Sequence, residues 1–158
     1  MKQVSATLLA TLSETARASA RLRSNHNLHP TLDAPVQRLA IAMEPDTYVR
    51  PHRHMQSWEL LIPLSGSFLL TVFDEAGQIT ERHFLGGVDG LSAIEFPADT
   101  WHTVTSLETG SVIFEVKEGP YLPVQPADLA AWSAAEGTPE AAAFVRQMRA
   151  DAKAMQQA

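Results

Sequence analysis

Cysteine is absent from this chain of 158 residues. Its absence excludes disulfide bonds, thiolate nucleophiles and the sulfur-rich zinc clusters that stabilise many small domains. Any transition metal bound by this sequence must therefore be held through nitrogen and oxygen atoms. Divalent Fe, Mn, Ni, Co, Cu and Zn all accept such ligands, and the sequence does not choose among them.

Positive charge and long apolar runs are also scarce. Lys and Arg number 12 against 18 Asp and Glu, and the formal net charge is −6. Nucleic acids and anionic membrane surfaces attract basic patches, so this balance argues against both as partners. No apolar stretch is long enough to cross a bilayer. Polar residues interrupt residues 1–14, which therefore do not resemble a signal peptide, and we expect a cytoplasmic protein.

The length fits one domain with its own core. We expect residues 1–158 to form a single domain, with a helix over residues 1–25, a β-barrel over residues 36–117 and a second helix over residues 138–157. Thr138 can cap the second helix. The apolar residues that recur at helical spacing are Val4, Leu8, Leu12 and Ala16 in the first helix, and Phe144, Met148, Ala152 and Met155 in the second.

Short apolar runs separated by turn residues lie between the two helices. The predicted strands cover residues 36–43, 47–50, 58–63, 67–74, 78–84, 92–96, 103–106 and 111–117. Asp74 to Gly77 predicts a hairpin turn, and Leu85 to Gly90 predicts a flexible loop. Such spacing is typical of an all-β barrel.

Three histidines and one glutamate have the spacing of a metal site. Side chains alternate faces along an extended strand, so His52 and His54 point one way and Arg53 points the other. Glu59 follows after four residues, enough to turn or bulge the chain and return a carboxylate to the same cavity. An H-x-H pair alone is a weak signal, since strand histidines are more often at the surface or hydrogen-bonded. With His102 at the start of a later apolar strand, the full set predicts His52, His54, Glu59 and His102 as ligands of one divalent metal ion.

The segments around these ligands resemble the paired motifs of the cupin superfamily. The first motif runs from His52 to Gly66 and the second from Pro97 to His102. The chain has Asp46 and Asp99 where glycine is usual, and Ser106 where asparagine is usual. Aspartate tolerates a left-handed backbone better than most residues, so we expect both aspartates to take over the turn positions. The resemblance implies a double-stranded β-helix or jelly-roll barrel that holds its metal through three histidines and one glutamate.

A closer resemblance, over residues 21–137, is to the WbuC family of cupin-fold metalloproteins. Four blocks carry it in the same order: Asn25 to Pro30, Asp33 to Arg38, Thr47 to His54 and Phe114 to Tyr121. Some members of that family lie among genes for surface polysaccharide synthesis. The resemblance therefore implies a metal site and a link to sugar metabolism, and it does not specify a reaction.

Candidate catalytic or substrate-binding residues outside the ligands are Arg38, Tyr48, Glu115 and Lys117. Arg38 and Lys117 lie in apolar strands, where an inward cation would bind a carboxylate or phosphate, although a strand cation can equally face solvent. Tyr48 would either stack on a sugar or serve in packing. Glu115 would act as a base or support a ligand, unless it faces outward.

The remaining histidines, His26, His29 and His83, lack ligand spacing with the main group, and we do not predict them as ligands. The segment from Asn25 to Pro30 is nevertheless a candidate to fold over the barrel mouth.

The leading hypothesis is a metal-dependent cupin enzyme, of oxygenase or isomerase type, that acts on a small polar molecule. Iron would favour oxygenation, whereas manganese, nickel or zinc would favour isomerisation or hydrolysis by Lewis acidity. The alternative is a non-catalytic sensor or structural module, which predicts a closed metal site with few converging polar groups. A metal-free sugar epimerase is a third possibility, against which the intact ligand set argues. The apolar stripes on both terminal helices favour a homodimer.

Overall fold

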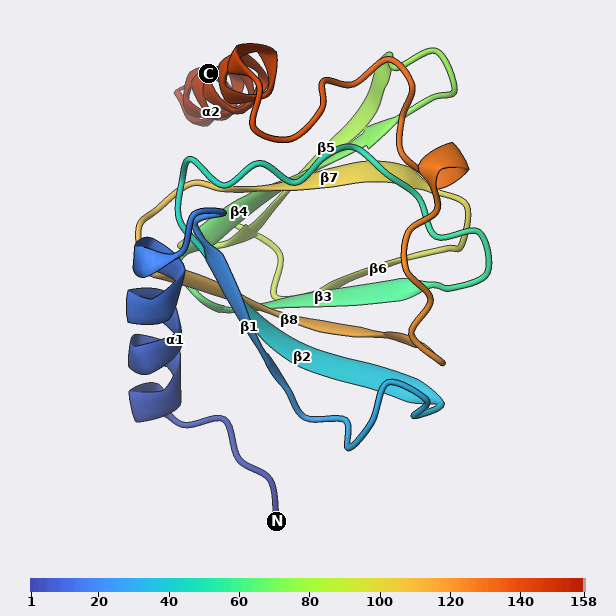
Figure 1. Ribbon diagram of the computed structural model, residues 1–158. Coiled ribbons are helices and arrows are strands. Elements are labelled where there is room, and N and C mark those ends of the chain that lie inside the picture. The colour runs from blue at the N-terminus through green and yellow to red at the C-terminus, as the bar shows by residue number, and fades with distance from the viewer. Residues whose placement is uncertain (158) are drawn as a thin grey trace.

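The computed structural model describes residues 1–157, most of whose regular structure is β-sheet (Figure 1). In chain order the elements are α1 (Ala6–Ala18), β1 (Arg23–Asn27), β2 (Val36–Met43), β3 (Glu59–Ser65), β4 (Ser67–Phe73), β5 (Ile79–Gly86), β6 (Ile94–Phe96), β7 (Trp101–Ser106), β8 (Ser111–Glu118), the 3-10 turn η1 (Pro126–Asp128) and α2 (Pro139–Gln156). The predicted all-β barrel with a helix near each end is confirmed.

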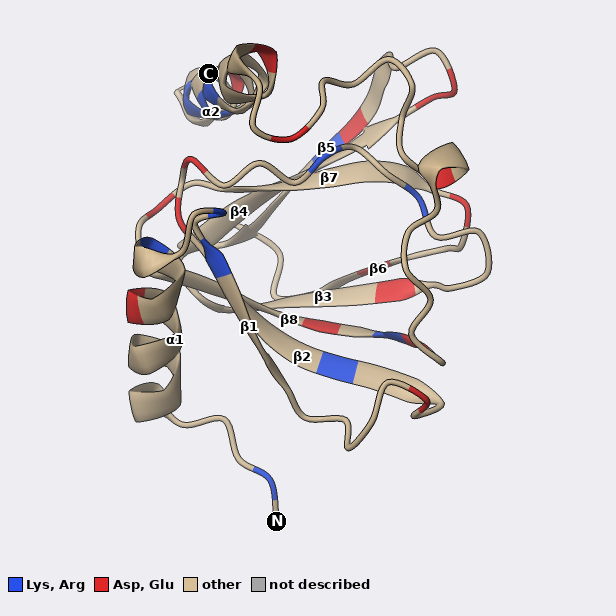
Figure 2. Cartoon of the chain, in the orientation of Figure 1, with Lys and Arg blue, Asp and Glu red and all other residues tan. Residues whose placement is uncertain are grey.

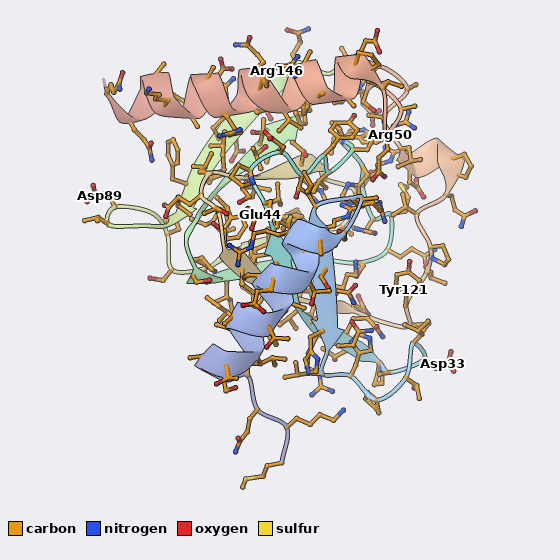
Figure 3. All side chains as sticks on the ribbon, turned by 60° about the vertical axis from the view of Figure 1, so that its left-hand side comes forward. Asp33, Glu44, Arg50, Asp89, Tyr121 and Arg146 are labelled. Atoms are coloured by element: carbon orange, nitrogen blue, oxygen red, sulfur yellow. The ribbon has the colours of Figure 1, made fainter. Side chains whose placement is uncertain are left out.

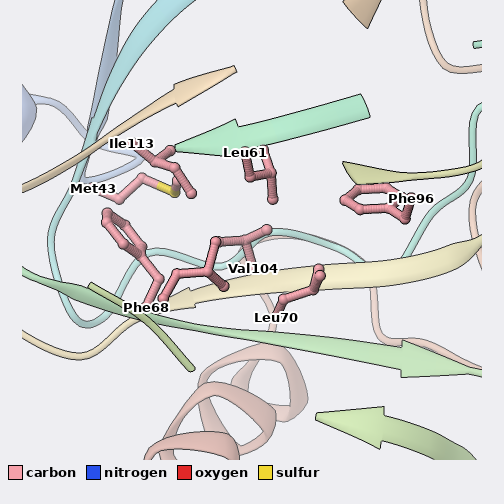
Figure 4. Packing of buried hydrophobic residues seen from close by; sticks show 8 residues of the cluster. Met43, Leu61, Phe68, Leu70, Phe96, Val104 and Ile113 are labelled. Atoms are coloured by element: carbon pink, nitrogen blue, oxygen red, sulfur yellow. The ribbon is translucent and has the colours of Figure 1, made fainter. Parts of the chain in front are cut away.

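Two antiparallel sheets form the barrel. One has the strand order β1-β2-β8-β3-β6 and the other has the order β5-β4-β7. The largest core cluster lies between them, where Leu61 from the first sheet faces Val104 from the second (Figure 4). The cluster comprises Met43, Leu61, Phe68, Leu70, Leu85, Phe96, Val104 and Ile113. Burying each of these larger side chains contributes about 1.5–3 kcal/mol, so this cluster is the main stabilising core.

Strands β2 and β8 bury residues on both of their faces. Ile41 of β2 pairs with Ile113 of β8, and both residues line the barrel interior. The alternate positions Ala40 and Ala42 point outward and pack beneath α1, against Leu12 and its neighbours. Small alanines let the helix approach the sheet closely, which explains why α1 lies along the outside of this sheet in Figure 1.

The N-terminal helix is shorter than residues 1–25. It ends at Ala18, where the Ser19 N–H bonds to the Ala16 carbonyl, and Leu22 adopts a positive φ of 54° that turns the chain. The next residues form β1, which pairs with β2 from Arg23 opposite Met43 to Asn27 opposite Leu39. The sequence did not predict this strand because it is almost wholly polar, and the backbone ladder with β2 holds it in place.

The predicted strand over residues 47–50 is also absent, and the segment is irregular. Side chains hold it in place of a ladder: the Thr47 hydroxyl donates to the Leu22 carbonyl at 2.6 Å, and Thr103 donates to the Val49 carbonyl at 2.5 Å. Of the two turn aspartates, Asp99 takes the expected left-handed conformation with φ of 65°. Asp46 does not: among the described residues, the turn at Asp46 contains no position with a positive φ.

Helix α2 covers the three-stranded sheet (Figure 1). The Thr138 hydroxyl accepts a hydrogen bond from the Ala141 N–H, as predicted for its cap. Met148 and Ala152 of the predicted stripe are buried, while Met155 is exposed. Arg82 of β5 forms an ion pair of 2.8 Å with Asp151 of the helix. No helix of residues 1–157 combines the length and apolar character that crossing a membrane requires.

Candidate metal centre

The backbones of His52 and His102 form a short antiparallel bridge. The His52 N–H donates to the His102 carbonyl at 3.0 Å, and the His102 N–H donates back at 2.9 Å. Their rings consequently lie with centroids 4.5 Å apart. Two residues further along, the Asp99 N–H donates to the His54 carbonyl at 2.8 Å. The segment that carries the H-x-H pair is thus attached to the start of β7 rather than forming a strand of its own.

Backbone carbonyls orient two of the imidazoles. Nδ1 of His52 lies 2.8 Å from the Arg50 carbonyl, and Nδ1 of His102 lies 2.9 Å from the Thr100 carbonyl. A carbonyl only accepts, so both Nδ1 atoms carry hydrogen. In a neutral ring this leaves the Nε2 lone pair free for a metal, which is the arrangement in which histidine ligands are commonly held.

Glu59 is the first residue of β3 and is 3% exposed. Its Oε1 lies 2.9 Å from Nε2 of His54, and its Oε2 lies 3.4 Å from Nε2 of His102. The rings of His52 and His54 are 5.0 Å apart at their centroids. The structure therefore brings together all four side chains that the sequence predicted as ligands.

The fit of these residues to a metal rests on donor chemistry and on pairwise spacing. Two donors about 2.1 Å from one ion lie about 3.0 Å apart at a right angle and about 3.4 Å apart at a tetrahedral angle. The distance of 2.9 Å between Glu59 Oε1 and His54 Nε2 is close to the first value, and that of 3.4 Å between Glu59 Oε2 and His102 Nε2 is close to the second. Among residues 1–157, no group of three or more His, Cys, Asp or Glu side chains is arranged at ligand distance around one centre. Three imidazoles and one carboxylate suit a borderline divalent ion.

Arg53, between the two histidines, points the other way as predicted. Its guanidinium lies 4.4 Å from the Trp101 ring centroid and reaches three carboxylates. Those of Glu75 and Asp99 are 2.9 and 3.0 Å away, and that of Asp128 is 3.7 Å away. These contacts fix the backbone from which His52 and His54 project.

Glu115 and Lys117 belong to the site because they share the inward face of β8 with Ile113. The register places Lys117 opposite Glu59 on β3, and Leu61 opposite Glu115. The Lys117 ammonium lies 2.9 Å from Glu115 and 3.3 Å from Glu59. Figure 2 shows these charged positions of β8 beside the acidic start of β3.

Burial and mutual contact change the acid–base properties of this cluster. Burial, and then the neighbouring His102 and His54, lower the pKa of His52 to about 3. Burial acts to raise the pKa of Glu59, but hydrogen bonds from His102 and His54 outweigh it and hold the pKa well below its usual range. Burial acts to lower the pKa of His102, and the same bond to Glu59 reverses this and raises it. The carboxylate is therefore ionised at neutral pH.

Burial raises the pKa of Glu115, and the nearby charge of Glu59 adds to the effect. Burial acts to lower the pKa of Lys117, but the adjacent Glu115 and Glu59 reverse this and raise it. Lys117 thus stays charged, while Glu115 is the carboxyl of the cluster that binds a proton most readily.

A cavity of roughly 520 Å³ lies beside His52, Glu59 and His102, within the barrel. Its inner wall is apolar and includes Ile41, Met43, Leu61, Val104 and Ile113. Its polar lining comprises Arg21, Arg23, Ser24, Asn25, Asn27, His29, Gln37, His52, Glu59, His102, Glu115, Lys117 and Tyr121. Such a mixture of apolar wall and converging polar groups is typical of a small-molecule site.

A second cavity of roughly 420 Å³ adjoins the first, since Lys117 and Tyr121 line both. His54 faces this second cavity, whereas the other three predicted ligands face the first. Tyr121 lies near Asp33 at one end of the molecule, far from Asp89 at the other end (Figure 3). The two cavities therefore meet near this end of the barrel.

Two candidates from the sequence lie outside the cavities. Arg38 is exposed, because inward positions of β2 are occupied by Gln37 and Leu39. Tyr48 is buried against α2, and its hydroxyl donates to the carbonyl of Ala134, in the segment before that helix, at 2.8 Å. Its role is therefore packing. His29 and the amides of β1 line the first cavity, but the sequence does not identify them as site residues. It predicts only that the segment from Asn25 to Pro30 lies near the barrel mouth.

Solved structures that are similar to this chain include the following three. KdgF from Halomonas sp. gives a TM-score of 0.50 at 18% identity, over 63% of this chain and 82% of that one. CapF, solved with the inhibitor 3-isopropenyl-tropolone, gives 0.56 at 18% identity, over 66% of this chain and 30% of that one. An HTH_3 family transcriptional regulator from Vibrio cholerae gives 0.51 at 20% identity, over 71% and 60%. The chain thus spans less than a third of CapF. At these identities the likeness shows the fold, a cupin-type barrel.

A family model also matches the sequence. The family is described as "Domain of unknown function (DUF6016)", and the match covers residues 4–85, which is more than half of the chain. The chain belongs to this family. The matched region runs from the N-terminal helix to β5 and includes His52, His54 and Glu59 of the candidate site, whereas His102 lies beyond it. No curated protein matches the sequence.

Proposed function

We propose that this chain is a metal-dependent cupin enzyme in which His52, His54, Glu59 and His102 hold one divalent ion. The observation that carries the proposal is the orientation of two imidazoles by backbone carbonyls, which directs Nε2 of His102 toward the Glu59 carboxylate. A histidine that served only in packing would not need its second nitrogen directed at a buried carboxylate in the wall of a cavity.

The proposed chemistry divides between the ion and the protein. A bound divalent ion supplies Lewis acidity toward a substrate oxygen, or activates water or dioxygen. Glu115 lines the cavity and has a raised pKa, so it is suited to accept or return a proton. Lys117 stays cationic and donates hydrogen bonds into the cavity, where it would orient a negatively charged or hydroxyl-bearing substrate.

A more specific proposal follows from the resemblance to the WbuC family: the substrate is a small sugar derivative, and the pathway is linked to surface polysaccharide metabolism. The polar face of β1 supports it, because this strand overlaps the Asn25 to Pro30 block and lines the cavity. We also propose a homodimer, for which the fold offers exposed apolar residues such as Leu122 and Trp132. Sedimentation at micromolar concentration tests that state.

The second candidate is a non-catalytic binding module. The depth of the site favours it, since Glu59 and His102 are only 3% and 2% exposed. A metal bound there for structural reasons would have no position open to solvent. The adjoining cavity and the charged pair of Glu115 and Lys117 favour the enzyme, because a structural site has no use for them.

Water access to the ion separates the two candidates. The protein is loaded with Mn²⁺, and the longitudinal relaxation of water protons is measured against free Mn²⁺ and against a Glu59→Gln variant. Enhanced relaxation that saturates near one ion per chain supports an open site and thus the enzyme. Stoichiometric binding without enhanced relaxation supports the closed module. Absence of stoichiometric binding contradicts both.

A further inference from the structure

A histidine outside the proposed metal centre has a buried ring nitrogen without a partner. His29 follows β1 and is 6% exposed. It lines the cavity of roughly 520 Å³ that also contains His52, Glu59 and His102. Its Nε2 is buried and makes no hydrogen bond with any described residue. Buried polar groups nearly always have partners, so an unpaired one in the wall of a cavity points to a ligand.

The contacts of His29 Nδ1 show which nitrogen of the ring carries the proton. The Arg38 N–H donates to His29 Nδ1 at 3.0 Å. The Arg38 carbonyl lies 3.1 Å from the same nitrogen, but it already accepts from the Leu28 N–H at 2.7 Å. A backbone N–H can only donate, so Nδ1 is the acceptor and Nε2 carries hydrogen in the neutral ring. The unpaired group is therefore a hydrogen-bond donor.

The sheet places this donor at the same end of the barrel as the metal centre. Arg38 adjoins Gln37 on β2, Gln37 pairs with Lys117 on β8, and Lys117 pairs with Glu59 on β3. His29 follows β1, which is one strand beyond β2. Neighbouring strands are about 4.8 Å apart, so the three steps from β1 to β3 span on the order of 14 Å. With a hydrogen bond at one end and the metal centre at the other, a molecule of monosaccharide size can fill the remaining distance, whereas a two-carbon acid such as oxalate is too short.

The polar groups between these points match a ligand with a negative charge and several hydroxyls. Arg23, Asn25 and Asn27 occupy alternate positions of β1 and all line the cavity. Asparagine amides both donate and accept, as hydroxyl groups require. Lys117 adds a cation, and Glu115 adds an acceptor beside it.

We propose that His29 is a substrate-binding residue, whose Nε2–H donates to an oxygen of a monosaccharide-sized polyhydroxy acid that reaches toward the metal centre. This inference rests on the proposed function, since it takes the metal centre as the other end of the ligand site. It adds the size and charge of the ligand and a residue that fixes its position.

A purely structural role for His29 can be separated by choice of substitution. His29→Asn places an amide oxygen near the position of Nδ1, so it can still accept from the Arg38 N–H, but it removes the Nε2 donor. His29→Gln does the reverse, because its terminal amide reaches the position of Nε2. His26→Asn is the matched control, since His26 is an exposed residue of the same segment.

The experiment measures metal content by plasma mass spectrometry and binding of D-gluconate, D-glucuronate and oxalate by calorimetry on the metal-loaded protein. We expect wild type and His26→Asn to bind at least one of the two sugar acids more tightly than oxalate. We expect His29→Asn to bind that acid about tenfold more weakly with metal content unchanged, and His29→Gln to recover much of the affinity.

The results that would contradict the role of His29, the ligand class and the proposed function differ from one another. Equal affinity in wild type and His29→Asn overturns the role of His29. Preference for oxalate, or absence of binding of both sugar acids to metal-loaded wild type, overturns the ligand class. A wild-type protein that binds no metal contradicts the proposed function itself, and the inference that rests on it fails for that separate reason.

Discussion

His52 and His102 lie opposite each other and exchange two backbone hydrogen bonds, of 3.0 and 2.9 Å. Fifty residues of sequence separate them, yet their side chains start from one bridge and project into one cavity. The relative position of the two imidazoles is therefore determined by the backbone and does not depend on long flexible side chains. Such preorganisation is what a metal or substrate site requires.

Arg53 is expected to stabilise the backbone that carries two of the proposed ligands. Replacing Arg53 by Ala removes its contacts with Trp101, Glu75 and Asp99. We expect the free energy of unfolding to fall by about 2 kcal/mol and metal affinity to fall about tenfold or more. Urea denaturation and competition with a chelator measure the two effects. Arg53→Lys should recover only part of the loss, since an ammonium cannot stack as a guanidinium does. Wild-type stability in Arg53→Ala would show that these contacts contribute little.

Lys117 is expected to matter as the partner of two buried carboxylates. Lys117→Met leaves Glu59 and Glu115 without their cation. We expect a loss of about 3 kcal/mol in unfolding free energy, because removing one member of a buried ion pair leaves uncompensated charge. The double variant Glu115→Gln, Lys117→Met should recover part of this loss, since the glutamine is neutral. If both variants lose the same stability in urea denaturation, the coupling between Glu115 and Lys117 is not the cause.

Gly66, which ends the first cupin-like motif, is expected to be intolerant of a side chain. Its φ is 69°, and a Cβ built there lies 2.1 Å from the Ser111 hydroxyl oxygen. Gly110 is a matched control, because its φ of 76° carries the same backbone strain but a Cβ meets nothing within 4 Å. We expect Gly110→Ala to cost about 1–2 kcal/mol and Gly66→Ala to cost clearly more. Equal costs in thermal or urea unfolding would mean that Ser111 moves aside freely.

Tyr48 is expected to titrate above the usual range for tyrosine. Burial raises its pKa from 10.0, whereas Tyr121, the other tyrosine of the chain, is 44% exposed. A raised pKa means that the folded state binds the proton more tightly, so this contribution to stability is complete below pH 10 and is lost as the pH rises through the folded pKa. Ultraviolet titration of wild type should show a phenolate step above the usual range for tyrosine, and this step should be absent from Tyr48→Phe. A single step in wild type at the ordinary pKa would contradict the burial of Tyr48.

Much of the barrel was predictable because its strands carry local signals. The strand from Val36 to Met43 has the same bounds in prediction and structure, and the pairing of His52 with His54 as proposed ligands was inferred from the two-residue period of extended chain. Strand β1 was not predicted because its residues are polar, and its pairing with the backbone of β2 leaves no apolar signal in the sequence. The direction of Arg38 was ambiguous because the outer face of β2 is buried under α1 at Ala40 and Ala42 but exposed at Arg38. Apolar alternation along the strand therefore does not reveal which face is inward.

His29 could not be identified as a cavity residue from the sequence. Nothing in its spacing from His52 or His102 connects it with the site, because the pairing of β1 with β2 and of β2 with β8 brings it to the cavity. The only sequence signal was the polar segment around it, which suggested a cover for the barrel mouth. Tyr48 illustrates the converse, since closeness in sequence to the ligands placed it among the candidates although it packs against Val145 of α2.

The most direct measurement is metal analysis of protein purified without a chelator or an affinity metal column, repeated on His52→Ala, His102→Ala and the control His83→Ala. His83 contacts Glu81 on β5 and lies outside both cavities. We predict close to one divalent transition metal per chain in wild type and His83→Ala, and loss of that metal in the other two variants. Absence of metal in wild type after reconstitution, or equal metal in all four proteins, would contradict the proposed site.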